Sequence, residues 1–129
     1  MSALVILGVE DVLALQRRQI ARWGGAEGIH DLPAIEAACA APRQVLRYEN
    51  GDVVDCAAAL MWHLCADHEF RDDNKRVGTV AGLVMLSANG VALPDEPGFQ
   101  AELIQLMMRT AQGETTRPEV AAFLRQRML

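Results

Sequence analysis

The sequence predicts an all-α fold, with about six helices in a single domain that spans residues 1–129. Hydrophobic residues make up 51% of the chain and aromatic residues only 5%, so Ala, Leu, Val and Met do most of the core filling, as in closely packed helices. Apolar residues recur at helical spacing in successive segments, whereas the alternation typical of strands appears over no convincing length. A chain of about 150 residues buries roughly 70% of its unfolded surface, so one modest core is feasible here.

Capping signals mark the first two helices. The first is predicted over Val9–Trp23, where apolar residues recur at intervals of three and four, and Gly24-Gly25 ends it. The second begins after Asp31, whose side chain can accept a hydrogen bond from the first turn. Pro33 is tolerated in that turn, and Pro42 is expected to stop the helix.

The two helices that follow are expected to form the buried centre. Asp52, at the end of the turn 50–52, can cap a helix over Val53–Ala66 that is apolar almost all round. A second apolar helix is predicted over Lys75–Ala88, and Asn89-Gly90 ends it. The predicted fold therefore joins two buried central helices by one polar loop.

Two more helices are predicted in the rest of the sequence. A helix is predicted over Gly98–Ala111, closed by Gly113. Thr116 and Glu119 have the Thr-x-x-Glu spacing of a capping box, which starts a last helix that reaches about Arg127.

Composition also limits the cellular setting and the partners. A net charge of −5 disfavours direct DNA binding, which needs a basic face. No apolar run has the length of a membrane span, and the N-terminal run is too short and lacks the basic residues of a signal peptide. Cys39, Cys56 and Cys65 are expected to be small buried hydrophobes in a reducing compartment. A soluble, cytoplasmic protein that does not bind membranes is therefore expected.

The polar loop between the central helices carries the chemistry. Lys75 and Arg76 fall in the first turn of a helix, where cations oppose the helix dipole, so folding alone would favour acidic residues there. A bound phosphate would reverse that penalty. His68 has the chemistry of a general base, and Asp72 that of a divalent-cation ligand. A phosphate-handling loop is therefore favoured over a solvated connector.

The loop resembles the Doc (death-on-curing) branch of the Fic/Doc proteins. That branch reads His-x-Phe-x-Asp-Ala-Asn-Lys-Arg, which this chain matches at His68, Phe70, Asp72, Asn74, Lys75 and Arg76. The flanks are similar too: Trp23-Gly24-Gly25, then Gly28-Ile29-His30-Asp31, then an Ala-rich helix before the loop. The resemblance covers nearly the whole chain and implies a Fic-like helical fold.

The resemblance also implies an activity. Doc-type proteins are toxins of toxin–antitoxin modules that act as protein Ser/Thr kinases, using Mg-ATP to phosphorylate elongation factor Tu and arrest growth. By position, His68 would take the proton of the target hydroxyl and Asp72 would hold Mg²⁺. Asn74, Lys75 and Arg76 would bind the nucleotide phosphates, and Arg76 would also act in catalysis by stabilising charge on the transferred group. Lys75, which replaces a Gly of Fic proteins, implies a reversed nucleotide with its γ-phosphate toward His68.

The resemblance further implies a small, Phd-like antitoxin that holds the toxin inactive. Residues 115–119 begin like the inhibitory Ser/Thr-x-x-x-Glu helix of many Fic proteins, but Pro118 interrupts the motif and Val120 follows it. The capping-box interpretation is therefore favoured, and a separate antitoxin is expected to dock on the surface between the first and last helices.

Two other functions stay open. Asp73 stands where the family has Ala or Gly and adds negative charge beside the phosphate-binding residues, and Val77 replaces a common Thr. A Fic-type nucleotidyl (AMP) transferase and a catalytically degenerate, Doc-like binding protein are therefore alternatives. Zinc is disfavoured because the spacing of His63 and His68 does not place both on one helix face. The methionines Met85, Met107 and Met108 are expected to fill the core.

Overall fold

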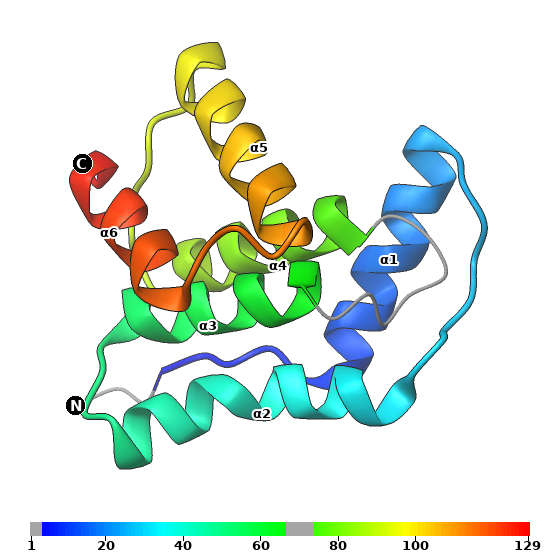
Figure 1. Ribbon diagram of the computed structural model, residues 1–129, viewed down its shortest axis with the longest axis horizontal. Helices are drawn as coiled ribbons and strands as arrows, with labels where there is room; N and C mark the ends of the chain where they lie inside the picture. Colours follow the sequence, from blue (N-terminus) through cyan, green and yellow to red (C-terminus); the bar gives the residue numbers. More distant parts are fainter. Residues whose placement is uncertain (1–3, 67–73) are drawn as a thin grey trace.

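The computed structural model describes residues 4–66 and 74–129, and the side chain of Asn74 lies outside that part. The described residues form six helices (Figure 1), which confirms the all-α prediction. In chain order they are α1 (Val9–Trp23), α2 (Leu32–Tyr48), α3 (Val53–Ala66), α4 (Asn74–Ala88), α5 (Pro97–Ala111) and α6 (Arg117–Arg127).

The helix ends carry the predicted caps. Side-chain oxygens of Asp31, Asp52 and Thr116 accept hydrogen bonds of 3.0–3.3 Å from backbone N–H groups of the helices that follow. These bonds satisfy donors that have no partner within the helix. Glycines with positive φ follow three helices: Gly24 (85°), Gly90 (78°) and Gly113 (78°).

The predicted end of the second helix at Pro42 is wrong, because α2 continues through Pro42 to Tyr48. A proline inside a helix removes one hydrogen bond and costs about 3 kcal/mol. Burial of the apolar side chains on both sides of Pro42 offsets this cost, since each large side chain contributes about 1.5–3 kcal/mol when buried. Ile35 and Val45 are such residues, and α2 packs with them against α3.

Helix α3 is the centre of the fold. It packs against α2, α4, α5 and α6, and its side chains are buried on nearly all sides, as predicted. Figure 1 shows α2 along one side of α3, with α5 and α6 on the other. Helix α4 packs against α3, α1 and α5, and its residues Val77, Ala81, Met85 and Leu86 are fully buried.

Two glycines of α4 allow it to approach α3 closely. A Cβ atom on Gly78 would lie 2.5 Å from the Sγ atom of Cys65, and one on Gly82 would lie 2.0 Å from the Cγ atom of Met61. Real Cβ atoms do not approach other atoms this closely, so larger residues at either position would push the two helices apart. The separation of α3 and α4 is therefore set by glycine.

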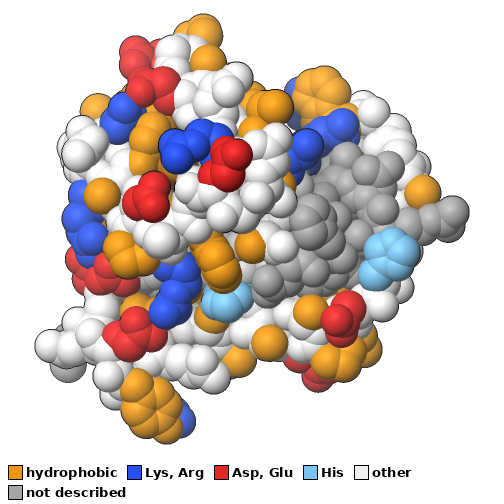
Figure 2. Space-filling view, in the orientation of Figure 1, with side chains coloured by type: hydrophobic (Ala, Val, Ile, Leu, Met, Phe, Trp, Pro, Cys, Tyr) orange, Lys and Arg blue, Asp and Glu red, His pale blue; other side chains and the backbone are white. Residues whose placement is uncertain are grey.

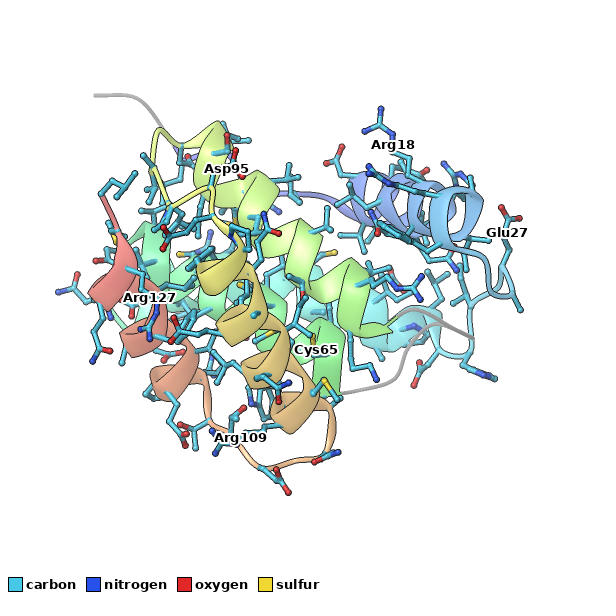
Figure 3. All side chains as sticks on the ribbon, turned by 90° about the horizontal axis from the view of Figure 1, so that it is seen from above. Arg18, Glu27, Cys65, Asp95, Arg109 and Arg127 are labelled. Carbon is cyan, nitrogen blue, oxygen red and sulfur yellow. The ribbon has the colours of Figure 1, made fainter. Side chains whose placement is uncertain are left out.

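The first and last helices do not form one surface. The prediction that an antitoxin binds on a surface between them is therefore wrong. Helix α1 packs on α4 and α2, whereas α6 packs on α3. Figures 1 and 3 show α1 and α6 at opposite ends of the molecule. A partner that touched both helices would have to span the whole protein.

The other expectations about side chains are mostly confirmed. The three cysteines are buried and form no disulfide, and Met85 and Met107 lie in the core. Met108 is an exception, because 39% of its surface is exposed. None of the helices in the described part is long and apolar enough to cross a membrane.

Candidate phosphate-binding site at the start of α4

The structure describes part of the predicted site. Lys75 and Arg76 lie in the first turn of α4, and both are exposed. Helix α4 begins at Asn74, one residue before the predicted start. His68 and Asp72 lie outside the described residues, as does the side chain of Asn74.

The start of α4 is positively charged. Its first turn contains no acidic residue, and its Lys75 and Arg76 add two cationic side chains to the positive end of the helix dipole. Each charge near a helix terminus changes the free energy by about 0.3–1 kcal/mol, and here the sign is unfavourable. An anion bound at the backbone N–H groups of this turn would make both interactions favourable. This turn can therefore hold phosphate oxygens.

A hydrogen bond within α4 and a contact with α3 hold this turn in place. The Thr79 hydroxyl donates a 2.7 Å hydrogen bond to the carbonyl oxygen of Lys75. The Cys65 thiol, from the last turn of α3, points at the same carbonyl at 3.8 Å and lies 3.5 Å from the Sδ atom of Met107 in α5. Figure 3 shows Cys65 near the centre of the molecule, whereas the other labelled residues lie toward its outside. The end of α3 and the start of α4 are thus held together by buried contacts.

A groove of about 430 Å³ begins at the same turn and runs between α1, α4 and α5. Its exposed apolar residues include Trp23, with 59% of its surface exposed, and Ile104, with 53%. The Arg76 guanidinium lies 6.0 Å from the centre of the Trp23 ring, and the Arg22 guanidinium lies 5.0 Å from it. The groove is lined by Gln19, Trp23, Lys75, Arg76, Thr79, Val80, Ile104, Met107 and Met108.

A second hollow, of about 230 Å³, lies at the other end of α3, beside α6. Its cations are already paired. Arg125 lies 2.8 Å from carboxylate oxygens of both Asp52 and Asp55, and Arg117 lies 3.5 Å from Glu49. Burial raises the pKa of Asp52, but hydrogen bonds from the Asp55 backbone and from Arg125 outweigh it and leave the pKa below its ordinary value. An anion would have to displace these carboxylates, so this hollow is a poor phosphate site.

The described part of the chain contains no cluster of metal-binding side chains. Among residues 4–66 and 74–129, no three His, Cys, Asp or Glu side chains converge. Figure 2 shows one face of the molecule, on which Lys and Arg side chains alternate with Asp, Glu and exposed hydrophobic ones. Among the described residues on that face, the Lys and Arg side chains form no continuous basic patch of the kind that binds nucleic acid.

Comparison with known proteins assigns the family. Residues 6–86, which include the loop and most of α4, match the Fic/DOC family. The chain belongs to this family. The protein kinase doc of Escherichia phage P1 is 32% identical over 118 residues, which cover 91% of this chain and 90% of that protein. The similarity to this relative supports membership of the Doc branch.

The sequence does not reveal the whole groove. Trp23 stands out only as a flank of the family pattern, and nothing marks Gln19, Ile104 or Met108 as ligand residues. Helical periodicity cannot tell an apolar side chain that packs in the core from one that lines an open groove. The exposure of Trp23, Ile104 and Met108 depends on how α1 and α5 pack against α4.

Proposed function

We propose that this protein is a Doc-type toxin of a toxin–antitoxin module. In this proposal it is a protein Ser/Thr kinase that transfers phosphate from Mg-ATP to a hydroxyl of a translation factor, such as elongation factor Tu, and arrests growth. The observation that carries the proposal is the first turn of α4, which contains no acidic residue and holds Lys75 and Arg76 at the positions of the family motif.

The remaining roles rest on the motif. His68 would accept the proton of the target hydroxyl, a contribution of typically 10²–10⁴-fold to the rate. Asp72 would hold Mg²⁺, which prefers carboxylate oxygens, and the bound ion would neutralise charge on the phosphates. Asn74 would add a donor to the backbone N–H groups of the α4 turn. Arg76 would stabilise the charge that develops on the transferred group.

The position of Lys75 favours phosphoryl transfer over nucleotidyl transfer. Fic proteins that transfer AMP have Gly at this position, which leaves room for an anion. The long side chain of Lys75 would fill that room and turn the nucleotide, so that its γ-phosphate faces His68. Nucleophilic attack by the target hydroxyl on phosphorus would then break the bond to the β-phosphate and release ADP.

Asp73 supports one other possibility. A carboxylate between Asp72 and Asn74 repels phosphate oxygens by about 1 kcal/mol at 4 Å in water, and by more where water is excluded. A protein that keeps the fold but has lost transfer is therefore the main alternative, and AMP transfer is the second.

One labelling experiment separates these functions. The purified protein is incubated with elongation factor Tu and with Mg-ATP that carries the label at either the α- or the γ-phosphate. Label transfer from the γ-position alone is the expected result. Transfer from the α-position alone would replace the kinase proposal with nucleotidyl transfer. No transfer from either position, restored by Asp73→Ala, would favour the degenerate protein.

Growth assays test the same site in cells. His68→Ala should abolish growth arrest, because no other group would take the hydroxyl proton. His30→Ala is the matched control, since His30 is exposed and lies outside the motif, and it should still arrest growth. Arrest that survives His68→Ala would rule out this mechanism.

A small antitoxin of the Phd type is the proposed partner. Co-expression of a short protein encoded next to this one should restore growth, and a stable complex of the two should be recovered. If no neighbouring reading frame relieves the arrest, the toxin–antitoxin part of the proposal fails while the kinase part stands.

A further inference from the structure

We infer that the groove between α1, α4 and α5 receives the base of the nucleotide, and that Trp23 is the surface on which the base stacks. The inference rests on the proposed function, because it assumes that phosphates bind at the start of α4. It goes beyond that function by assigning a second part of the ligand to residues outside the loop motif.

The groove and the phosphate site are continuous. Lys75 and Arg76 belong to the first turn of α4 and also line the groove. A nucleotide has a polyanionic end and a flat, mostly apolar end. Lys75 and Arg76 match the polyanionic end of the nucleotide. The apolar groove continues from these two cations and matches the flat end.

The groove has the size and lining of a small-molecule site. Its volume of about 430 Å³ lies within the usual range of roughly 300–1,000 Å³ for such sites. Its walls are mostly apolar, with Ile104 and Met108 on one side. The groove also contains two uncharged polar side chains, Gln19 and Thr79, which can bond the edge of a ring.

Among the described residues, Trp23 is the one aromatic residue that lines this groove, and the Arg76 guanidinium lies 6.0 Å from the centre of its ring. Trp23 ends α1 with 59% of its surface exposed, so it adds little to the core. A planar ring of this kind can stack on any nucleobase, because every base has a flat π-face. The inference therefore concerns a purine or pyrimidine ring and does not require hydrogen bonds specific to adenine.

The test compares two ligands that differ in the base. Binding of Mg-ATP and of Mg-tripolyphosphate, which has no base or ribose, is measured by calorimetry for the wild type, Trp23→Leu and Trp23→Phe. Trp23→Leu should weaken ATP binding by roughly 5- to 100-fold and change tripolyphosphate binding by less than about twofold. Trp23→Phe keeps a flat ring and should retain most of the ATP affinity.

Tyr48→Leu is the matched control. Tyr48 is also an exposed aromatic residue at a helix end, with 75% of its surface exposed, but it lies on α2 and does not line the groove. Its replacement should leave both affinities unchanged. In Trp62→Phe, Trp23 is the single tryptophan, and ATP but not tripolyphosphate should quench its fluorescence.

Each other outcome has a distinct meaning. If Trp23→Leu weakens both ligands equally, Trp23 only positions Arg76 and the base lies elsewhere. If it leaves ATP binding unchanged but weakens binding of an inhibitory protein, the groove is a protein dock and the inference is wrong. If the wild type binds neither ligand, the proposed function fails as well. If ATP binding depends on Trp23 but no phosphate is transferred, the base site stands without the kinase.

Discussion

At the scale of single residues, Arg76 and Arg22 provide a direct comparison. Both guanidinium groups lie within 6.0 Å of the Trp23 ring centre, but only Arg76 belongs to the first turn of α4. If Arg76 acts on phosphate, the two residues should differ in function although they share an aromatic neighbour.

We expect Arg76→Ala to lower kcat/KM for ATP by roughly 10- to 100-fold, because a hydrogen bond to a charged group is worth about 1.5–3 kcal/mol. Arg22→Ala should stay within about twofold of the wild type, as is usual for an exposed charge. Both are measured by phosphoryl transfer at varied ATP concentration. Equal losses in the two variants would show that both arginines act only through Trp23.

At the scale of helices, the contact between α3 and α4 decides where the site lies. Gly78 faces the last turn of α3, and a Cβ atom added to it would also lie 3.2 Å from the carbonyl oxygen of Met61 and 3.3 Å from the amide nitrogen of Cys65. Backbone atoms in a buried helix cannot move aside as the end of a long side chain can. A change at Gly78 should therefore shift the whole first turn of α4.

Gly78→Ala should lower the free energy of unfolding by about 1–2 kcal/mol, measured by urea denaturation. Alanine gains up to about 1 kcal/mol of helix propensity, but overpacking costs about 1–3 kcal/mol. Cys65→Ala should partly restore stability to Gly78→Ala, because it removes the Sγ atom at 2.5 Å. Gly98→Ala in α5 is the control: nothing lies within 4 Å of its Cβ position, so it should be neutral or stabilising. If Gly78→Ala leaves the free energy of unfolding unchanged, α4 can shift away from α3 without loss of stability.

At the scale of the whole molecule, most of the fold follows from the sequence because its signals are local. Caps at Asp31, Asp52 and Thr116 and glycine stops locate the helix ends through hydrogen bonds within a few residues. The error at Pro42 arises because long-range burial against α3 outweighs a local preference. The groove escapes prediction for the same reason, since it depends on how three helices pack together. Lys75 and Arg76 are predictable because a short motif identifies them.

A further long-range contact holds α6 to the start of α3. Arg125 bonds Asp52 and Asp55 at 2.8 Å each, and Asp52 also caps α3. These carboxylates are only partly buried, so the contact is worth about 1 kcal/mol or less and is weakened by salt. Because the folded pKa of Asp52 lies below its unfolded value, its contribution is fully present above the unfolded pKa. That contribution is lost as the pH falls through the folded pKa.

Arg125→Ala should therefore lower the free energy of unfolding by about 0.5–1 kcal/mol at pH 7. The difference from the wild type should shrink below about pH 4 and in 1 M salt, because protonation or screening removes the same interaction from the wild type. Urea denaturation at pH 7 and pH 3, with and without salt, measures both effects. Arg109→Ala is the matched control: its partner Glu114 lies 3.9 Å away and both side chains are exposed, so little change is expected at either pH. A loss in Arg125→Ala that is the same at pH 3 would show that Arg125 stabilises α6 by packing of its side-chain carbons, and the charges would then have no part in joining α6 to α3.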